Sequence, residues 1–497
     1  MNGLDCRLSL TIILKSHRDT RNACRRLCRK DKGRTTMQEL FMRSRSCRWN
    51  LLTIVGVTWF SLWSGANQVL LAAGTVSVPK ETQEAFDKQQ YEQVLEQLTK
   101  LEKEQGVDPD VRRLKIRSFL KLGNPKDALG EYDNLESVLK HDDESLLREV
   151  ALGFIVIMVK DMREQMRGAA YTALKEVDSD DIVPYFEDGL SDGSGPVRAL
   201  AVEGLGRSEA GRKSPKLRTA IEDQAGLVKA RVVRTLGKTG DPGVMSLVES
   251  AAKDELTTVR IAAYGALIRL GKKEAWAELQ QAAASPNPED RADAIRTMAE
   301  LKDQRGAPLM MEALTYKQPS VRGAAARGLG HLGHKEARRQ IEQLLKDPIP
   351  AVRESAVGSL AELGGPESVS VLKQVLGDGN FTVRASAIAA LLQLGEPYST
   401  VAGSAQLMAQ QNDMAMRASV AYALGKATKA NAPGAISLLA SLTADPLPGP
   451  KIVALRSLGH VGDRELVPLM KEALHDINDA VRATAAGALL HILQQKK

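Results

Sequence analysis

The seven histidines of this 497-residue chain are the side chains best suited to metal or acid-base chemistry. Five lie in its second half, at His331, His334, His460, His475 and His491. None stands in an HExxH motif, and no phosphate-binding glycine loop or GxSxG elbow occurs in a suitable setting. The sequence therefore predicts no catalytic residue, no cofactor and no metal site.

The four cysteines, Cys6, Cys24, Cys28 and Cys47, all lie within the first 50 residues. Cys24 and Cys28 have a spacing that metal ligands can use, but no second pair completes a zinc site. The rest of the chain has no cysteine, which is compatible with an oxidising compartment.

A short phrase of Val-Arg, small residues and Leu-Gly recurs eleven times, and its basic residue serves here as the anchor of each copy. Consecutive anchors are 31 residues apart, except for 33 before Arg417 and 34 before Lys451. The anchors are Arg167, Arg198, Lys229, Arg260, Arg291, Arg322, Arg353, Arg384, Arg417, Lys451 and Arg482. A fixed period in this range indicates a solenoid, in which each unit buries its apolar face against its neighbours.

Each copy has the pattern of a helical hairpin. In the copy at 341–364, Asp347-Pro348 marks a turn, and Val352, Ala356 and Leu360 then recur at helical spacing. Gly364 ends that helix, as a residue able to take positive φ can. The apolar stripe predicts that the second helix packs against its neighbours.

Three columns recur between copies. Leu stands seven residues after most anchors and Ala three residues after them. Asp stands six residues before the anchor at Asp192, Asp254, Asp347, Asp378, Asp445 and Asp476. An Asp ahead of a helix can accept hydrogen bonds from its free N–H groups, typically worth about 1 kcal/mol.

This pattern resembles the HEAT repeat, in the short variety grouped with phycobilisome-lyase subunits. The resemblance covers roughly residues 161–497, about eleven units, and implies an all-α, α-α superhelix. We expect the hairpins to stack into one continuous curved rod. In that family, Asp and Arg of adjacent units form a ladder, which would here consist of Asp192, Arg198, Asp254, Arg260, Asp347, Arg353, Asp378, Arg384, Asp476 and Arg482.

Two enzymatic relatives of this repeat class offer an alternative function. Deoxyhypusine hydroxylase binds iron through His-Glu pairs, whereas this chain has no His-Glu dipeptide, and His334-Lys335-Glu336 does not match. Bilin lyases resemble the chain in repeat type only. An enzyme or enzyme subunit of this lyase or oxidoreductase group remains the alternative, and we predict a chain that is not an enzyme.

Residues 80–145 have a weaker period of 34 and resemble tetratricopeptide hairpins over Lys121 to Leu139. An ordinary helical cap for the solenoid is the alternative. Residues 146–160 are strongly apolar but short for a bilayer span, so we expect a buried junction helix.

The N-terminal region separates from the rest by charge. Residues 1–50 carry 13 Lys/Arg and four Asp/Glu, a balance of +9, so the remainder sums to −2 of the total +7. A nucleic-acid partner is therefore not predicted. We expect residues 1–48 to be a basic leader outside the fold, and residues 49–79 to be a signal peptide or an uncleaved membrane anchor. The true start is Met1, Met37 or Met42, and the expected location is the periplasm or the exterior, or the inner membrane if the segment is retained.

Two polar columns on the second helix, five and nine residues after the anchor, share one helix face. Together with one neighbour they form a mainly basic strip for another protein or an acidic peptide: Arg207, Arg231, Arg234, Lys238, Arg269, Arg296, Arg327 and His331. Tyr264 and Tyr422, four and five residues after their anchors on second helices, are further candidates, with packing in the core as the alternative for Tyr264. A solvated face that keeps the chain soluble is the competing interpretation. We predict a non-catalytic, protein-binding scaffold of bacterial type, with a membrane-tethered assembly factor as a second alternative.

Overall fold

The computed structural model describes residues 78–106 and 108–495, all within the second of two units, Val76–Lys497. The predicted leader at 1–48 and almost all of the segment at 49–79 lie outside the described residues. Throughout the described ranges the regular structure is helical, without any strand, which confirms the all-α prediction. Within those ranges, no helix combines the length and the apolar character that crossing a bilayer requires.

Four helices precede the repeats and form two antiparallel hairpins. They are α3 (Lys80–Asp87), α4 (Tyr91–Gln105), α5 (Pro109–Lys121) and α6 (Pro125–Leu139), each packed against the next. Proline opens α5 and α6 because a helix has no use for the N–H of its first residue. The Asp108 side chain accepts from the N–H groups of Asp110 and Val111, which fixes the start of α5.

Eleven hairpins follow, and each has an outer and an inner helix. The outer helices are α7 (Glu144–Val156), α9 (Val183–Gly189), α12 (Pro215–Thr219), α14 (Met245–Ala251), α16 (Ala275–Ala283), α18 (Ala307–Ala313), α20 (Arg338–Gln343), α22 (Gly365–Val375), α24 (Tyr398–Ala409), α26 (Ala432–Leu442) and α28 (Val467–Ala473). The inner helices are α8 (Glu164–Leu174), α10 (Gly195–Leu205), α13 (Gly226–Gly237), α15 (Thr257–Arg269), α17 (Pro288–Glu300), α19 (Pro319–His331), α21 (Pro350–Leu363), α23 (Phe381–Gln393), α25 (Met414–Leu424), α27 (Pro448–Val461) and α29 (Asp479–Gln494). Residues 146–160 therefore lie in α7 and the 3₁₀ turn η1 (Ile157–Lys160), the outer half of the first hairpin.

Local signals set the ends of the inner helices. The Asn380 side chain accepts from the N–H groups of Thr382 and Val383 at 2.9 and 3.4 Å and so caps α23. Gly364, with a φ of 64°, ends α21 in a conformation that favours glycine.

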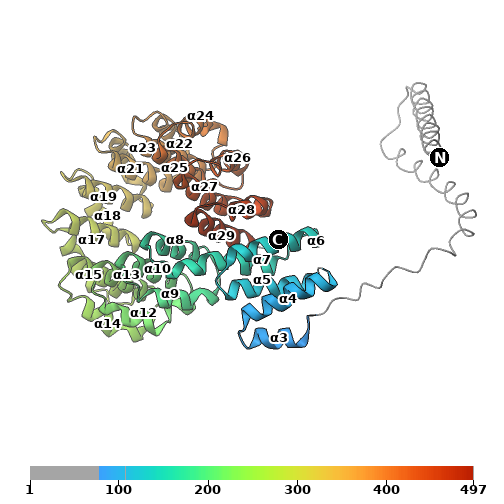
Figure 1. Ribbon diagram of the computed structural model, residues 1–497. Helices are drawn as coiled ribbons and strands as arrows, with labels where there is room; N and C mark the ends of the chain where they lie inside the picture. The colour runs from blue at the N-terminus through green and yellow to red at the C-terminus, as the bar shows by residue number, and fades with distance from the viewer. Residues whose placement is uncertain (1–77, 107, 496–497) are drawn as a thin grey trace, which may run out of the picture. The chain divides into compact units, whose positions relative to one another are not determined.

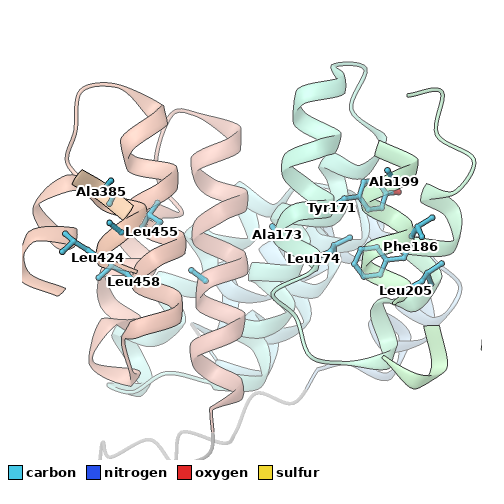
Figure 2. Packing of buried hydrophobic residues seen from close by; sticks show 14 of the residues in the cluster. Tyr171, Ala173, Leu174, Phe186, Ala199, Leu205, Ala385, Leu424, Leu455 and Leu458 are labelled. Carbon is cyan, nitrogen blue, oxygen red and sulfur yellow. The ribbon is translucent and has the colours of Figure 1, made fainter. Parts of the chain in front are cut away.

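The repeated Leu and Ala columns form the core. The Leu side chains seven residues after the anchors, from Leu174 to Leu489, are at most 6% exposed. Leu174 and Leu205 lie near Phe186 between two consecutive hairpins (Figure 2). Glycine allows neighbouring inner helices to approach closely, since a Cβ on Gly330 would lie 2.6 Å from the Cα of Ser359.

The inner helices form a closed circle (Figure 1). Each packs against the next, and α29 also packs against α8 and α7 at the beginning of the series. The hairpins expected to stack into one continuous curved rod therefore close into a ring within the unit Val76–Lys497. We call the contact between the first and last repeats the seam.

The seam differs in register from the other contacts between repeats. Between consecutive repeats, a glycine eight residues after one anchor contacts the residue that lies six positions after the next anchor. Gly459 and Ala488 are one such pair. At the seam, Gly487, five residues after its anchor, meets Ala173, six after its own, with an added Cβ 3.1 Å from the Ala173 Cα. The last helix is thus displaced by three residues, about 4.5 Å along its axis.

Polar contacts also close the seam. His460 Nε2 lies 2.9 Å from a carboxylate oxygen of Glu176, and Arg163 bridges Asp161 and Asp479 at 2.8 and 3.0 Å. Lys471 of α28 pairs with Asp142 at 2.8 Å and with Glu136 of α6, which ties the N-terminal hairpins to the last repeat.

Candidate binding surface

The face of the inner helices that points away from the outer helices is called the inner face here. It carries the columns five and nine residues after each anchor. Of the eight residues predicted for partner binding, five are exposed on this face: Arg207, Lys238, Arg296, Arg327 and His331. The other three, Arg231, Arg234 and Arg269, are half-buried.

Several carboxylates on the inner face neutralise part of the predicted basic strip. Glu203 pairs with Arg231 and lies 2.6 Å from Lys175 Nζ, so it holds two cations at once. Arg269 lies 3.6 Å from Glu300. Arg296 pairs with Asp293, a residue two positions after its anchor that the two-column reasoning did not include. The strip is therefore not uniformly basic.

Positive charge remains in excess beside the seam. Lys175, Arg207, Arg231, Arg234 and Arg456 form a group, defined here as the basic cluster, and the carboxylates beside it are Glu176, Glu203 and Asp178. Within the described residues, no ion pair involves Arg207, Arg234 or Arg456. Lys175 and Arg456 were not predicted, although Arg456 occupies the same column as Arg234.

The electrostatics of the cluster show mutual repulsion. Burial lowers the pKa of Arg231, and the neighbouring Arg234 guanidinium lowers it further. Burial also lowers the pKa of Lys175, with Arg207 and Arg231 acting in the same direction. The Nε atoms of Arg231 and Arg234 are shielded from solvent without a hydrogen-bond partner. An anionic group placed beside these cations would relieve the repulsion between them.

A cavity of about 230 Å³ opens beside the basic cluster at the seam. Lys175, Arg207 and Ser208 line it from the first two repeats, and His491 lines it from the last. Phe186 contributes an apolar side. Ring closure adds His491 to a lining that otherwise comes from residues 175–208.

A second, larger hollow of about 640 Å³ lies on the inner face across α19 to α25. Gly358, Ala385 and Ala389 contribute to its floor, and Arg327 and Tyr422 stand at opposite sides. The Tyr422 side chain is 60% exposed, with Lys426 Nζ 4.7 Å from its ring centroid. By contrast Tyr264 is half-buried and packs against the core.

The Arg and Asp residues predicted as a ladder lie on the turns between outer and inner helices. Arg353 shows the arrangement: Nε and Nη2 donate to the Asp378 carboxylate of the next repeat at 2.8 Å each, and Nη1 donates to the Asp347 carbonyl of its own repeat at 2.8 Å. Each such Arg therefore ties two consecutive turns together. The other carboxylate rungs are Arg167–Asp192, Arg198–Asp223, Lys229–Asp254, Arg322–Asp347, Arg417–Asp445 and Lys451–Asp476.

Some ladder positions lack the expected rung. Arg260 and Arg384 donate to carbonyls of their own turns and have no carboxylate of the next repeat, because Ser285 and Gln411 stand where an Asp would be. Arg482 pairs with Asp479 of its own helix. Asp223 and Asp161 also occupy the Asp column, and the sequence reasoning passed over both.

The ladder carboxyls share one electrostatic pattern. Burial alone would raise the pKa of Asp378, but hydrogen bonds from Arg353 and from the Asn380 N–H outweigh it and lower the pKa overall. The same balance holds at Asp192, Asp347 and Asp445. The shifted carboxyls therefore belong to structural pairs. Within residues 78–106 and 108–495, no group of three His, Cys, Asp or Glu side chains could hold a metal ion.

Comparison with known proteins identifies the repeat. The sequence model of HEAT repeats matches residues 214–299, 276–338 and 307–392. No curated protein matches the chain. Among solved structures, human deoxyhypusine hydroxylase in complex with glycerol is 20% identical, over 52% of this chain and 98% of that chain, with a TM-score of 0.28.

Two further solved structures match the chain at low sequence identity. The CpcE–CpcF complex of phycocyanin lyase from Nostoc sp. PCC7120 is 20% identical, over 46% of this chain and 93% of that chain, with a TM-score of 0.32. Kap121p bound to Nup53p is 13% identical, over 82% and 56%, with a TM-score of 0.33. The family model thus identifies residues 214–392 as HEAT repeats, and helical hairpins of the same kind continue on both sides of them.

Proposed function

We propose that the ring is a non-catalytic scaffold whose inner face binds an acidic segment of another protein. The observation that carries this proposal is the basic cluster, in which five cations outnumber three carboxylates and three of the cations make no ion pair within the described residues. An acidic side chain would supply the missing negative charge and could accept hydrogen bonds from the exposed guanidinium of Arg207. The exposed cations at Lys238 and Arg327 extend the same charge along the face.

The test is charge reversal at three cations that make no ion pair within the described residues. The variant combines Arg207→Glu, Arg234→Glu and Lys238→Glu. The matched control combines Lys253→Glu, Lys317→Glu and Lys346→Glu, which change the net charge equally at exposed positions away from the inner face. Both variants keep the ladder and the Leu and Ala columns intact, so the fold should survive in each.

The probe is a fluorescent peptide of alternating glutamate and alanine, measured by anisotropy at low salt. Each reversed contact should cost about 0.5–1 kcal/mol, so the triple variant should bind about tenfold or more weakly, and the control within about twofold of the parent. Added salt should weaken the parent's binding, because exposed charges are screened. Equal binding by the parent and the triple variant would rule out the basic inner face as the binding surface.

We also propose that the chain is exported, with residues 49–79 as its signal or anchor. This proposal is supported by the order of basic residues before Leu51, an apolar run to Trp63 and the small residues Ser64-Gly65-Ala66. N-terminal sequencing of the protein from its native host tests it. A mature end near Asn67 means cleavage, retention in the membrane fraction with an earlier end means an anchor, and a soluble protein with an intact segment contradicts export.

A further inference from the structure

The large hollow on the inner face exists because two consecutive repeats lack a long side chain in the same column. Five residues after the anchor, α21 has Gly358 and α23 has Ala389, whereas α19 has Arg327 and α25 has Tyr422. The missing side chains leave a recess of about 640 Å³ with a floor of small residues. We call this hollow the recess.

Gly358 is not required by packing. A Cβ added there would meet no atom within 4 Å, and its φ is not in the left-handed region. Glycine inside a helix costs about 1 kcal/mol relative to alanine. Gly330, on the preceding inner helix, shows the usual reason for such a residue, since its added Cβ would strike Ser359. At Gly358, the loss of helix stability has no such packing reason, because the space above the helix is open.

The sides of the recess carry charge and one exposed aromatic ring. On the first side, Arg327 is exposed and donates to Ser355 Oγ at 3.3 Å. On the opposite side, Lys426 lies over the exposed ring of Tyr422. Glu354 is the one carboxylate in the lining, and it already accepts a hydrogen bond from Thr382 Oγ1. The recess thus offers an apolar floor between two cations.

The dimensions suit a helix. Along α23 the lining runs from Thr382 to Gln393, about 16 Å, or about three helical turns. Across α21 to α25, two interhelical spacings give about 16–20 Å, against about 10–12 Å for a helix with its side chains. An extended peptide would find few free backbone partners here, because the N–H and C=O groups of the inner helices bond within those helices.

We propose that the recess binds an amphipathic helix of a partner protein, with its apolar face on the Gly358–Ala389 floor and acidic residues toward Arg327 and Lys426. This inference rests on the proposed function, because the recess is part of the inner face. It names the bound form of the partner, a helix read by i, i+3, i+4 and i+7 anchors. Tyr422 supplies the aromatic contact that commonly dominates such interfaces.

The test uses Gly358→Trp in the full chain. The indole fills the recess, while the fold is undisturbed because the added side chain meets open space and the helix gains a better former. The matched control is Gly403→Trp on the outer helix α24, where glycine is also exposed and an added Cβ also meets nothing within 4 Å. Tyr422→Ala is a second variant that enlarges the recess instead of filling it.

The probe is a display library of random peptides of about 16 residues, about four helical turns, selected on the wild-type chain. Enriched peptides should show helical apolar periodicity with acidic flanks. They should bind Gly358→Trp at least tenfold more weakly, Tyr422→Ala severalfold more weakly, and Gly403→Trp as tightly as wild type. Circular dichroism of the complex between an enriched peptide and the chain should show more helix than the spectra of the two separate components added together.

Three results overturn the inference: no enriched peptide, enriched peptides without helical periodicity, or enriched peptides that bind Gly358→Trp as tightly as wild type. The proposed function fails separately. If Arg207→Glu, Arg234→Glu and Lys238→Glu together abolish binding of the acidic probe while Gly358→Trp changes nothing, the basic face survives and the recess does not. If the triple variant binds the acidic probe normally but recess-dependent peptides remain, the basic cluster fails and the recess stands.

Discussion

Replacing Gly487 with leucine should open the ring without unfolding its repeats. An added Cβ at Gly487 lies 3.1 Å from the Cα, the Cβ and the carbonyl oxygen of Ala173, so backbone atoms of α8 must move. Overpacking of this kind costs about 1–3 kcal/mol. The better helix propensity of leucine helps α29 in the open and closed rings alike, so it cancels in the equilibrium between them. The seam should therefore open about 5- to 150-fold more often.

Hydrogen exchange read by mass spectrometry measures this change. Amides of α8 and α29 should exchange faster in Gly487→Leu, whereas those of α19 and α21, on other repeats, should stay protected. The matched control is Gly459→Leu, whose added Cβ would lie 2.9 Å from Ala488 between two consecutive repeats. That control should loosen α27 against α29 and leave α8 protected. Unchanged exchange at α8 in Gly487→Leu would refute the seam.

Three further predictions concern the ladder and the N-terminal hairpins. Arg353→Met removes two hydrogen bonds to Asp378 and should lower the free energy of unfolding by about 1.5–3 kcal/mol. Arg260→Met should lower it less, because Arg260 has no carboxylate partner in the next repeat. Thermal melts compare the two variants, and equal losses of stability would contradict the ladder. The folded-state pKa values of Asp192, Asp347, Asp378 and Asp445 lie below the ordinary value. Their contribution to stability is therefore complete above about pH 4 and is lost as the pH falls through the lower folded-state values. The melting temperature should drop steeply in acid, and less steeply in Asp445→Asn. Lys471→Met leaves Glu136 and Asp142 without their shared cation, and limited proteolysis should then release α3–α6 faster than in Lys451→Met, which breaks a rung elsewhere.

The repeat pattern predicted the hairpins because nearest-neighbour packing is periodic. Leu360 and Ala356 are fully buried because they contact the neighbouring repeats. The same contact recurs in each copy, so the sequence shows it as a period of 31 residues. The Asp at residue 378 is equally legible, because it recurs at a fixed distance from the anchor. The period therefore predicts the contacts between each repeat and the next.

Ring closure could not be predicted in the same way. Closure depends on the small rotation at each step, and eleven repeats close only when the steps add to about a full turn. The seam also uses a different register, with Gly487 rather than a residue eight after the anchor facing Ala173, so no column marks it. The basic cluster was missed in part for this reason, since Lys175 and Arg456 come from opposite ends of the chain.

The recess was legible in principle. Gly358 and Ala389 stand in the column that holds Arg296 and Arg327 in the two preceding copies, and two small residues in succession indicate a gap. A pattern of charged side chains does not reveal positions where the side chain is small. Ion pairs such as Arg296 with Asp293 depend on rotamers and on a third column, which the two-column pattern does not contain.

A disulfide across the seam tests the closed ring most directly. In a full chain with Cys6, Cys24, Cys28 and Cys47 replaced by serine, Ala173→Cys and Gly487→Cys place two Cβ atoms about 3.1 Å apart, slightly inside the usual disulfide range of about 3.5–4.5 Å. Mild oxidation should link them within one chain, and the linked species should migrate faster on a non-reducing gel and melt at a higher temperature. Two thiols that stay free, or that link only between chains, would contradict the ring.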